Sequence, residues 1–384
     1  MDFKLSEEHL MIRQAARDFA NNECLSGVIE RDEHQKFPHE QVSKLADLGF
    51  LGMMVSPEYG GAGLDTISYV IAMEEISKVD ASTSVCMSVN NSLVCFGLEA
   101  FGSEEQKIKY LTPLAQGKKN EELYIGAFLL SEPEAGSDAT SQRTTAEEKD
   151  DHYIINGVKN WITNGSSASV YLVFAQTHPE KGNRGINVFI VEKNWPGVKV
   201  GAKENKLGIR GSDTHSISFT DVKVPKENRV GGDGFGFKFA MMTLSGGRIG
   251  IASQALGLAS GAMERSVAYS KERKTFGTEI KNHQIIQFKL ADMATRIEAA
   301  RLLCFRAAWQ KDSNSDYTES AAMAKVFSSE TAMWATSEAI QIFGGYGYVK
   351  EYHVERMMRD AKITQIYEGT SEMQRIVISR GILK

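Results

Sequence analysis

Residues 321–343 read AAMAKVFSSETAMWATSEAIQIF, with apolar side chains recurring three and four positions apart. That spacing places them on one face of an α-helix. Residues 288–304 repeat it, and the last of the seven prolines, Pro225, precedes both stretches. An interior proline costs a helix about 3 kcal/mol, so a long proline-free stretch favours long helices. We therefore predict a C-terminal helical bundle with loops near 271–282 and 312–317.

The beginning of the chain is also predicted to be helical. Ser6 can cap a helix that runs to about Asn22, and Pro38 can stand in the first turn of another helix. The glycine-rich residues 60–63 indicate a loop before a third helix, which continues through Ile76.

Residues 123–224 have a different pattern, in which short β-branched and aromatic runs alternate with turn-forming residues. The runs are residues 153–155, 170–174, 186–191 and 217–219. They predict a small antiparallel β-barrel or sandwich. The expected fold class is thus α+β multi-domain, with an N-terminal α-helical domain (1–120), a middle β domain (121–230) and a C-terminal four-helix-bundle domain (231–384).

Composition excludes several classes of protein. The chain has 384 residues, 42% of them hydrophobic and 24% charged, which is ordinary for a globular protein. Its net charge of -5 gives no basic surface, so we expect neither nucleic acid nor an anionic membrane as partner.

No apolar run approaches the ~20 residues of a membrane span, and the N-terminus resembles no signal peptide. The four cysteines form no CxxC pair and are expected to pack as apolar residues in a reducing compartment. We predict a cytoplasmic protein.

Common metal and phosphate motifs are missing. His39 and Glu40 begin like a zinc-protease helix, but Ser43 stands where the second histidine is needed, so no metal site is predicted. The glycine-rich residues 231–236 lack dinucleotide-binding spacing, and we expect no strand before them.

Three segments could carry a ligand or only structure. Residues 130–138 are polar and follow an expected strand, so they could hold a ligand or form a capping turn. Trp161, beside a turn and Thr163, suits a flat heteroaromatic ligand, although a tryptophan there is more often core. Residues 344–348 follow a long predicted helix. They could bind a ligand, although such a glycine set more often forms a helix C-cap and turn.

Glu368 is a candidate base. It lies between Tyr367 and Gly369, after the apolar Ile363 and Ile366. A carboxylate in apolar surroundings has a raised pKa and can accept a proton near neutrality. Gly369 permits a bend that could aim it into a cavity, although Glu-Gly pairs also occur in surface turns.

Together and in this order, these segments resemble the acyl-CoA dehydrogenase family over nearly the whole chain. The matching segments are residues 59–61, 130–138, 161–165, 272–277, 339–345, 359–362 and 366–372. Three further segments look most like the short-chain, butyryl-CoA members: residues 88–93, 207–212 and 247–257. The resemblance implies an enzyme of fatty acid β-oxidation.

The resemblance also implies FAD, held between the β domain and the C-terminal bundle. The residues it assigns to the flavin side are Phe128, Leu129, Leu130, Ser131, Ser137, Trp161, Ile162 and Thr163, with Thr370 and Glu372 beside the base. Those assigned to the adenine diphosphate half of an FAD bound mainly by a neighbouring subunit are Arg273, Phe276, Gln284, Gln341, Gly344 and Gly345. Such sharing implies a homo-oligomer, usually a tetramer.

By the same resemblance, Glu368 removes the α-proton of an acyl-CoA while flavin N5 accepts the β-hydride, giving a trans-2-enoyl-CoA. An electron-transfer flavoprotein would then accept the electrons. The Glu368 backbone N–H and a flavin hydroxyl would stabilise the thioester oxygen. Some relatives carry the base on an earlier helix. The corresponding residues 244–248 contain no glutamate here, which supports Glu368 as the base.

The CoA end is expected to contact Ser137, Ser245, Arg248 and Gly369. Ser245 departs from the aspartate usual at this position in the short-chain relatives. The alternatives are the same chemistry on a branched-chain or medium-chain acyl-CoA, a flavin oxidase, and a non-catalytic flavoprotein scaffold of the same fold.

Overall fold

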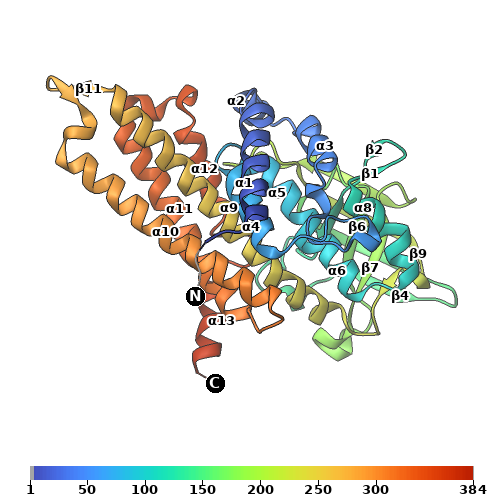
Figure 1. The fold of residues 1–384 in the computed structure, drawn as a ribbon. Coiled ribbons are helices and arrows are strands. Elements are labelled where there is room, and N and C mark those ends of the chain that lie inside the picture. The colour runs from blue at the N-terminus through green and yellow to red at the C-terminus, as the bar shows by residue number, and fades with distance from the viewer. Residues whose placement is uncertain (1–3, 384) are drawn as a thin grey trace.

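The computed structural model describes residues 4–383, which form helices, then a sheet, then helices (Figure 1). The first group of helices comprises α1 (Glu7–Phe19), α2 (Val28–Glu33), α3 (His39–Asp47), α4 (Thr66–Ser77), α5 (Ala81–Ser88), α6 (Phe96–Phe101), α7 (Glu104–Gln106) and α8 (Thr112–Gln116). Ser6 caps α1 by accepting a hydrogen bond from the His9 N–H at 3.2 Å, and Pro38 directly precedes α3. The starts predicted at Ser6 and after residues 60–63 are therefore confirmed, and Pro38 stands one residue before the first turn in which it was expected.

A single eight-stranded sheet forms the middle of the molecule, in the order β10-β7-β6-β4-β5-β9-β8 with β3 beside β6. Its strands are β3 (Gly126–Leu129), β4 (Thr145–Glu148), β5 (His152–Thr163), β6 (Val170–Gln176), β7 (Ile186–Glu192), β8 (Val198–Lys203), β9 (Thr214–Pro225) and β10 (Arg229–Val230), preceded by the hairpin β1 (Lys118–Lys119) and β2 (Glu122–Leu123). Every residue of β6 is buried, as its unbroken apolar run requires.

The sheet differs from the sequence prediction in two places. Most pairs are antiparallel as expected, but β6 has two parallel neighbours. β3 runs parallel to it, because a long crossover containing β4 and β5 separates them, and β4 meets it in parallel where Thr145 pairs with Gln176. The strand β10 leads directly into residues 231–236, where no strand was expected. β10 has only two residues, too few to show the alternation of apolar and polar side chains by which a strand is predicted. It forms because it pairs with β7, which lies far from it in the sequence.

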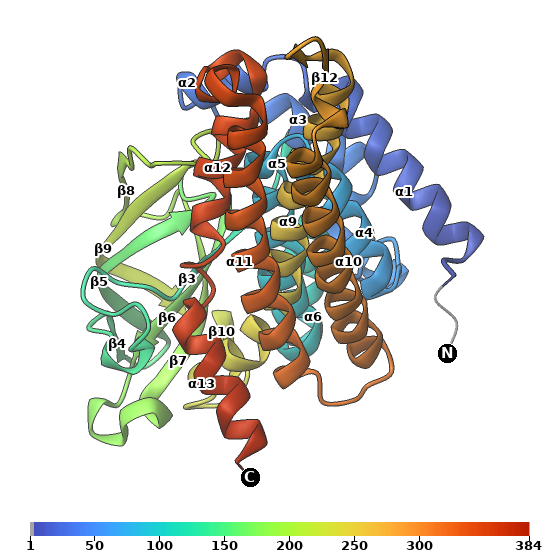
Figure 2. The same ribbon diagram turned by 90° about the vertical axis from the view of Figure 1, so that its left-hand side faces the viewer.

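Long helices follow the sheet: α9 (Gly236–Glu272), α10 (Gln284–Asp312), α11 (Thr318–Phe343), α12 (Val354–Ile363) and α13 (Ser371–Ile382). The hairpin β11 (Lys274–Thr275) and β12 (Thr278–Glu279) joins α9 to α10, and residues 313–317 join α10 to α11. Both predicted loops are therefore confirmed. Figure 2 shows α9, α10 and α11 side by side, with α12 and α13 along the edge facing the sheet. The central helix α9 packs against α11, α10 and α4.

Salt bridges and hydrogen bonds fix α12 to the other two parts of the molecule. Arg359 on α12 donates to both carboxylate oxygens of Asp32, at 3.3 and 2.7 Å. The carboxylate of Asp360 accepts from the Ile209 N–H at 2.5 Å, and Arg210 donates to the Asp32 carbonyl at 3.0 Å. These bonds fix the C-terminal half of α12, and with it the start of the segment 364–370 that joins α12 to α13.

All four cysteines are buried and unpaired, as predicted. Within residues 4–383, no helix has the length and apolarity needed to cross a membrane. The same residues gather no group of three metal-ligating side chains. The domain bounds 1–120, 121–230 and 231–384 stay predictions.

Candidate active site

Glu368 lies in a tight turn between α12 and α13. Its φ is 53° and that of Gly369 is 89°, so two successive residues adopt the left-handed conformation. This is easy for Gly369 but costs about 1 kcal/mol or more at a glutamate. Thr370 then caps α13 by accepting a hydrogen bond from the Met373 N–H at 3.3 Å. The bend expected at Gly369 is present, and Glu368 itself shares it.

The carboxylate of Glu368 is turned inward, against α9. Its Oε2 atom is buried and has no hydrogen-bond partner among the described residues. It lies so close to Gly247 that a Cβ added there would be 2.1 Å away. Burial raises the pKa of Glu368 to about 7, while the charges of Lys325 and Arg248 act in the opposite direction. An unpartnered carboxyl group that titrates near neutrality is suited to accept a proton.

A bulge in β5 exposes Trp161. The pairing of β5 with β9 shifts register between Lys159 and Ile162, and Trp161 takes a φ of 62°. Trp161 is 59% exposed, so the core alternative for this tryptophan is wrong. The Asn160 N–H donates to the Ser131 carbonyl at 2.9 Å, which brings the predicted segments 130–138 and 161–165 together.

A buried ion pair anchors the first of these segments. Lys159 Nζ donates to Glu132 Oε1 at 2.8 Å and to the Leu130 carbonyl at 3.2 Å. Glu132 also accepts from the N–H groups of Arg143 and Thr144, at 2.5 and 3.0 Å. These bonds set the direction in which residues 130 and 131 leave β3.

The residues around the bulge fit a planar heteroaromatic group such as a flavin. Phe128 and Thr163 are partly exposed, and Trp161 is exposed. The hydroxyl groups of Ser131 and Thr163 have no partner within the described part of the chain, so they are free to bond the polar edge of a ligand. Leu129, Leu130 and Ile162 are buried beneath this surface, and Ser137 lies exposed in the turn that follows.

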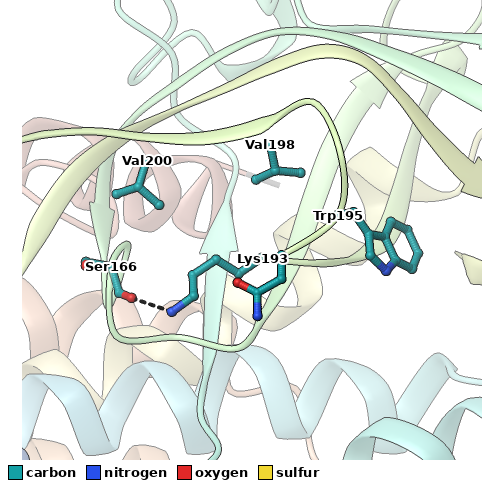
Figure 3. Close-up of a pocket in the computed structure, with 6 residues that line it drawn as sticks. Ser166, Lys193, Trp195, Val198 and Val200 are labelled. Carbon is teal, nitrogen blue, oxygen red and sulfur yellow. Dashed lines mark hydrogen bonds between the residues drawn. The ribbon is translucent and has the colours of Figure 1, made fainter.

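A hollow of about 200 Å³ lies beside the Glu368 turn. Thr370 and Glu372 both line it, as do Gln365 and Ile366. A larger hollow of about 360 Å³ lies on the sheet, where Lys193 donates to the Ser166 carbonyl at 2.8 Å (Figure 3). None of the predicted site residues lines the larger hollow, and it is separate from the candidate site.

The second predicted group of FAD residues lies elsewhere, at the end of the bundle that carries the β11–β12 hairpin. Its members are the exposed Arg273, Phe276, Gln284, Gln341, Gly344 and Gly345. The Arg273 guanidinium lies 5.4 Å from the centre of the Tyr346 ring. Phe276 is 98% exposed and Gly344 has a φ of 62°. Figures 1 and 2 both place this end of the bundle away from the sheet. One chain therefore does not bring the two groups together.

Ser245 and Arg248, the predicted CoA contacts, lie on the turn of α9 that passes the Glu368 turn. Both are buried, and Arg248 Nη1 donates to Ser245 Oγ at 3.3 Å. Arg248 Nε has no partner among residues 4–383. The arginine also acts electrostatically on Glu368, a relationship that the sequence prediction did not include.

Sequence reasoning also missed Gly247, Lys325 and Gln374, which contact the Glu368 turn. A signal existed for one of them. Lys325 falls on the helical face of Ala321, Ala332 and Ala339, where a lysine is out of place unless it has a buried partner.

Three family models and many known proteins match this chain. Residues 6–118, 127–222 and 234–383 match the N-terminal, middle and C-terminal domains of acyl-CoA dehydrogenases. The chain is 50% identical over 384 residues to the short-chain-specific acyl-CoA dehydrogenase of Clostridium acetobutylicum, covering 100% of both chains.

Solved structures give the same result. The butyryl-CoA dehydrogenase from Megasphaera elsdenii superposes with a TM-score of 0.97 at 47% identity, with 100% of both chains covered. A solved chain from work on the electron transferring flavoprotein of Acidaminococcus fermentans, and on flavin-based electron bifurcation, has a TM-score of 0.97 at 50% identity and the same coverage. The chain thus belongs to the acyl-CoA dehydrogenase family of FAD-dependent oxidoreductases.

Proposed function

We propose that the protein catalyses the α,β-dehydrogenation of a short-chain acyl-CoA, with Glu368 as the base. The observation that carries the proposal is the Glu368 carboxyl group: its Oε2 atom is buried without a hydrogen-bond partner among the described residues, and burial raises its pKa to about 7. A group with these properties can take a proton from the α-carbon at neutral pH.

The backbone of the same residue supports the proton transfer. No acceptor is found for the Glu368 N–H in the described chain, so this donor is free to bond the thioester oxygen on which negative charge develops. The bound FAD supplies the acceptor for the hydrogen that leaves the β-carbon. Ser131, Trp161 and Thr163 would hold its ring, and Thr370 and Glu372, which line the hollow beside the Glu368 turn, would contact it near the base.

The short-chain preference is supported by the relatives. The Clostridium acetobutylicum protein is named short-chain specific and the Megasphaera elsdenii protein butyryl-CoA dehydrogenase, and both align with this chain over its full length. A change of one methylene alters binding by only about 1–3 kcal/mol, so a branched-chain or medium-chain acyl-CoA is the alternative.

The assembly belongs to the same proposal. The end of the bundle that carries the β11–β12 hairpin lies away from the sheet in one chain, which supports an FAD shared between subunits of a homo-oligomer, by family resemblance a tetramer. The relationship to the Acidaminococcus fermentans chain supports an electron-transfer flavoprotein as the electron acceptor.

Anaerobic bleaching of the purified yellow protein tests the proposal. We expect butyryl-CoA to bleach it faster than octanoyl-CoA, and the reverse order would overturn the short-chain preference. Glu368→Gln keeps the shape of the side chain but removes the base, so it should retain FAD and acyl-CoA binding and lose bleaching. Near-normal bleaching of this variant would refute the role of Glu368.

A further inference from the structure

A buried lysine holds the turn that carries Glu368. Lys325 on α11 has no exposed surface, and its Nζ donates to the Gly369 carbonyl at 2.6 Å. Among the described residues, no carboxylate is hydrogen-bonded to it. A buried ammonium group normally pairs with a carboxylate, because taking it out of water is costly. Here the charge is directed at the backbone beside the base instead.

A second side chain, on α13, also holds the turn. Gln374 on α13 donates from Nε2 to the Gly369 carbonyl at 2.8 Å and to the Glu368 carbonyl at 3.3 Å. Two successive left-handed residues persist only where their surroundings fix them. Lys325 and Gln374 supply that constraint from α11 and α13, and they set where the Glu368 side chain and N–H point.

The charges around the carboxylate come from three helices. Lys325 on α11 and Arg248 on α9 are the cations that act on it, and Glu372 on α13 acts on Lys325. Tyr69 on α4 and Tyr367 in the turn also face Glu368, and burial raises the pKa of both phenols, so they stay neutral. Burial lowers the pKa of Lys325 to about 8, which leaves it charged at neutral pH.

We propose that Lys325 is a positioning residue for the base: its ammonium group fixes the Glu368–Gly369 turn and keeps a positive charge beside the carboxylate. The inference rests on the proposed function of Glu368. This role of Lys325 differs from a purely structural one, because a buried lysine that only filled space would not affect the protonation of Glu368.

The test is the pH profile of anaerobic flavin reduction by butyryl-CoA, measured on the FAD-loaded enzyme. Removing the charge with Lys325→Met favours protonated Glu368, so we expect the midpoint to move up by about one pH unit. Lys325→Arg keeps the charge and should keep the midpoint. Lys325→Gln keeps a donor for the Gly369 carbonyl without the charge, and it should shift the midpoint as Met does. If Lys325→Met fails to fold, the midpoint of Lys325→Gln alone tests whether the charge acts on Glu368.

Lys311 provides a matched control. Burial also lowers its pKa to about 8, but its Nζ contacts Met54 Sδ at 3.5 Å, and the charges that act on Glu368 are those of Lys325 and Arg248. Lys311→Met should leave the midpoint unchanged. A yellow, folded Lys325→Met or Lys325→Gln enzyme with the wild-type midpoint would overturn the inference. A wild-type enzyme that butyryl-CoA does not reduce would instead overturn the proposed function.

Discussion

Gly247 gives the Glu368 carboxylate the space it occupies, and an alanine there would remove that space. A Cβ at position 247 would lie 2.1 Å from Glu368 Oε2 and 2.8 Å from Leu93 Cδ2, whereas ordinary contact begins near 3.4 Å. Both atoms are ends of flexible side chains, so they can move without disturbing the backbone. The carboxylate must withdraw by about 1 Å or more, and a displacement of that size can lower a rate about 100-fold.

The fold should tolerate the same substitution. Alanine stabilises a helix interior by about 1 kcal/mol relative to glycine, and crowding costs about 1–3 kcal/mol. We expect Gly247→Ala to fold, to retain FAD and to keep its unfolding free energy within about 2 kcal/mol of wild type. Its rate of flavin reduction by butyryl-CoA, measured by anaerobic stopped-flow, should fall about 100-fold.

The preceding residue is a matched control. A Cβ at Gly246 would have its nearest neighbours, the Ser92 carbonyl and the Tyr317 hydroxyl, at 3.9 Å. Gly246→Ala should therefore reduce flavin at a near-normal rate and gain up to about 1 kcal/mol of stability. Equal rates for the two alanine variants would refute the argument that Gly247 shapes the position of the base.

Two further predictions concern the protonation of Glu368 and the anchoring of residues 130–138 by Lys159. The rate of flavin reduction should rise with pH around a midpoint near 7, because Glu368 accepts a proton only as a carboxylate and burial raises its pKa to about 7. A profile that is flat between about pH 6 and 8 would contradict this. Lys159→Met leaves the Glu132 carboxylate buried without its cation, so the unfolding free energy in urea should fall by about 3–5 kcal/mol, with weaker FAD retention. Unchanged stability would show that the pair does not anchor the loop.

The order of helices, sheet and helices followed from the sequence because each signal is local. The proline-free, periodic stretches became α10 and α11, and the β-branched runs became β5, β6, β7 and β9. The parallel pairing of β3 with β6 and the short strand β10 were not predicted, because both depend on neighbours distant in the chain.

The candidate site shows the same division. Local motifs identified Glu368, Trp161 and Ser131, and the structure assembles the last two through the β5 bulge. Whether Trp161 belonged to the core or to a surface was open in the sequence, and its φ of 62° in the bulge decided it. The left-handed φ of Glu368 itself gave no sequence signal, because a glutamate rarely adopts it without tertiary constraint.

The sequence by itself determined the family, the three-part fold and the position of a carboxylate followed by a glycine. Only the tertiary structure decided what surrounds that carboxylate: the space at Gly247, the charges of Lys325 and Arg248, and the clamp from Gln374. These residues lie on α9, α11 and α13, and their contacts form only when the helices pack. Burial and charge, which set the pKa of Glu368, are properties of the assembled neighbourhood and not of the residue or its sequence neighbours.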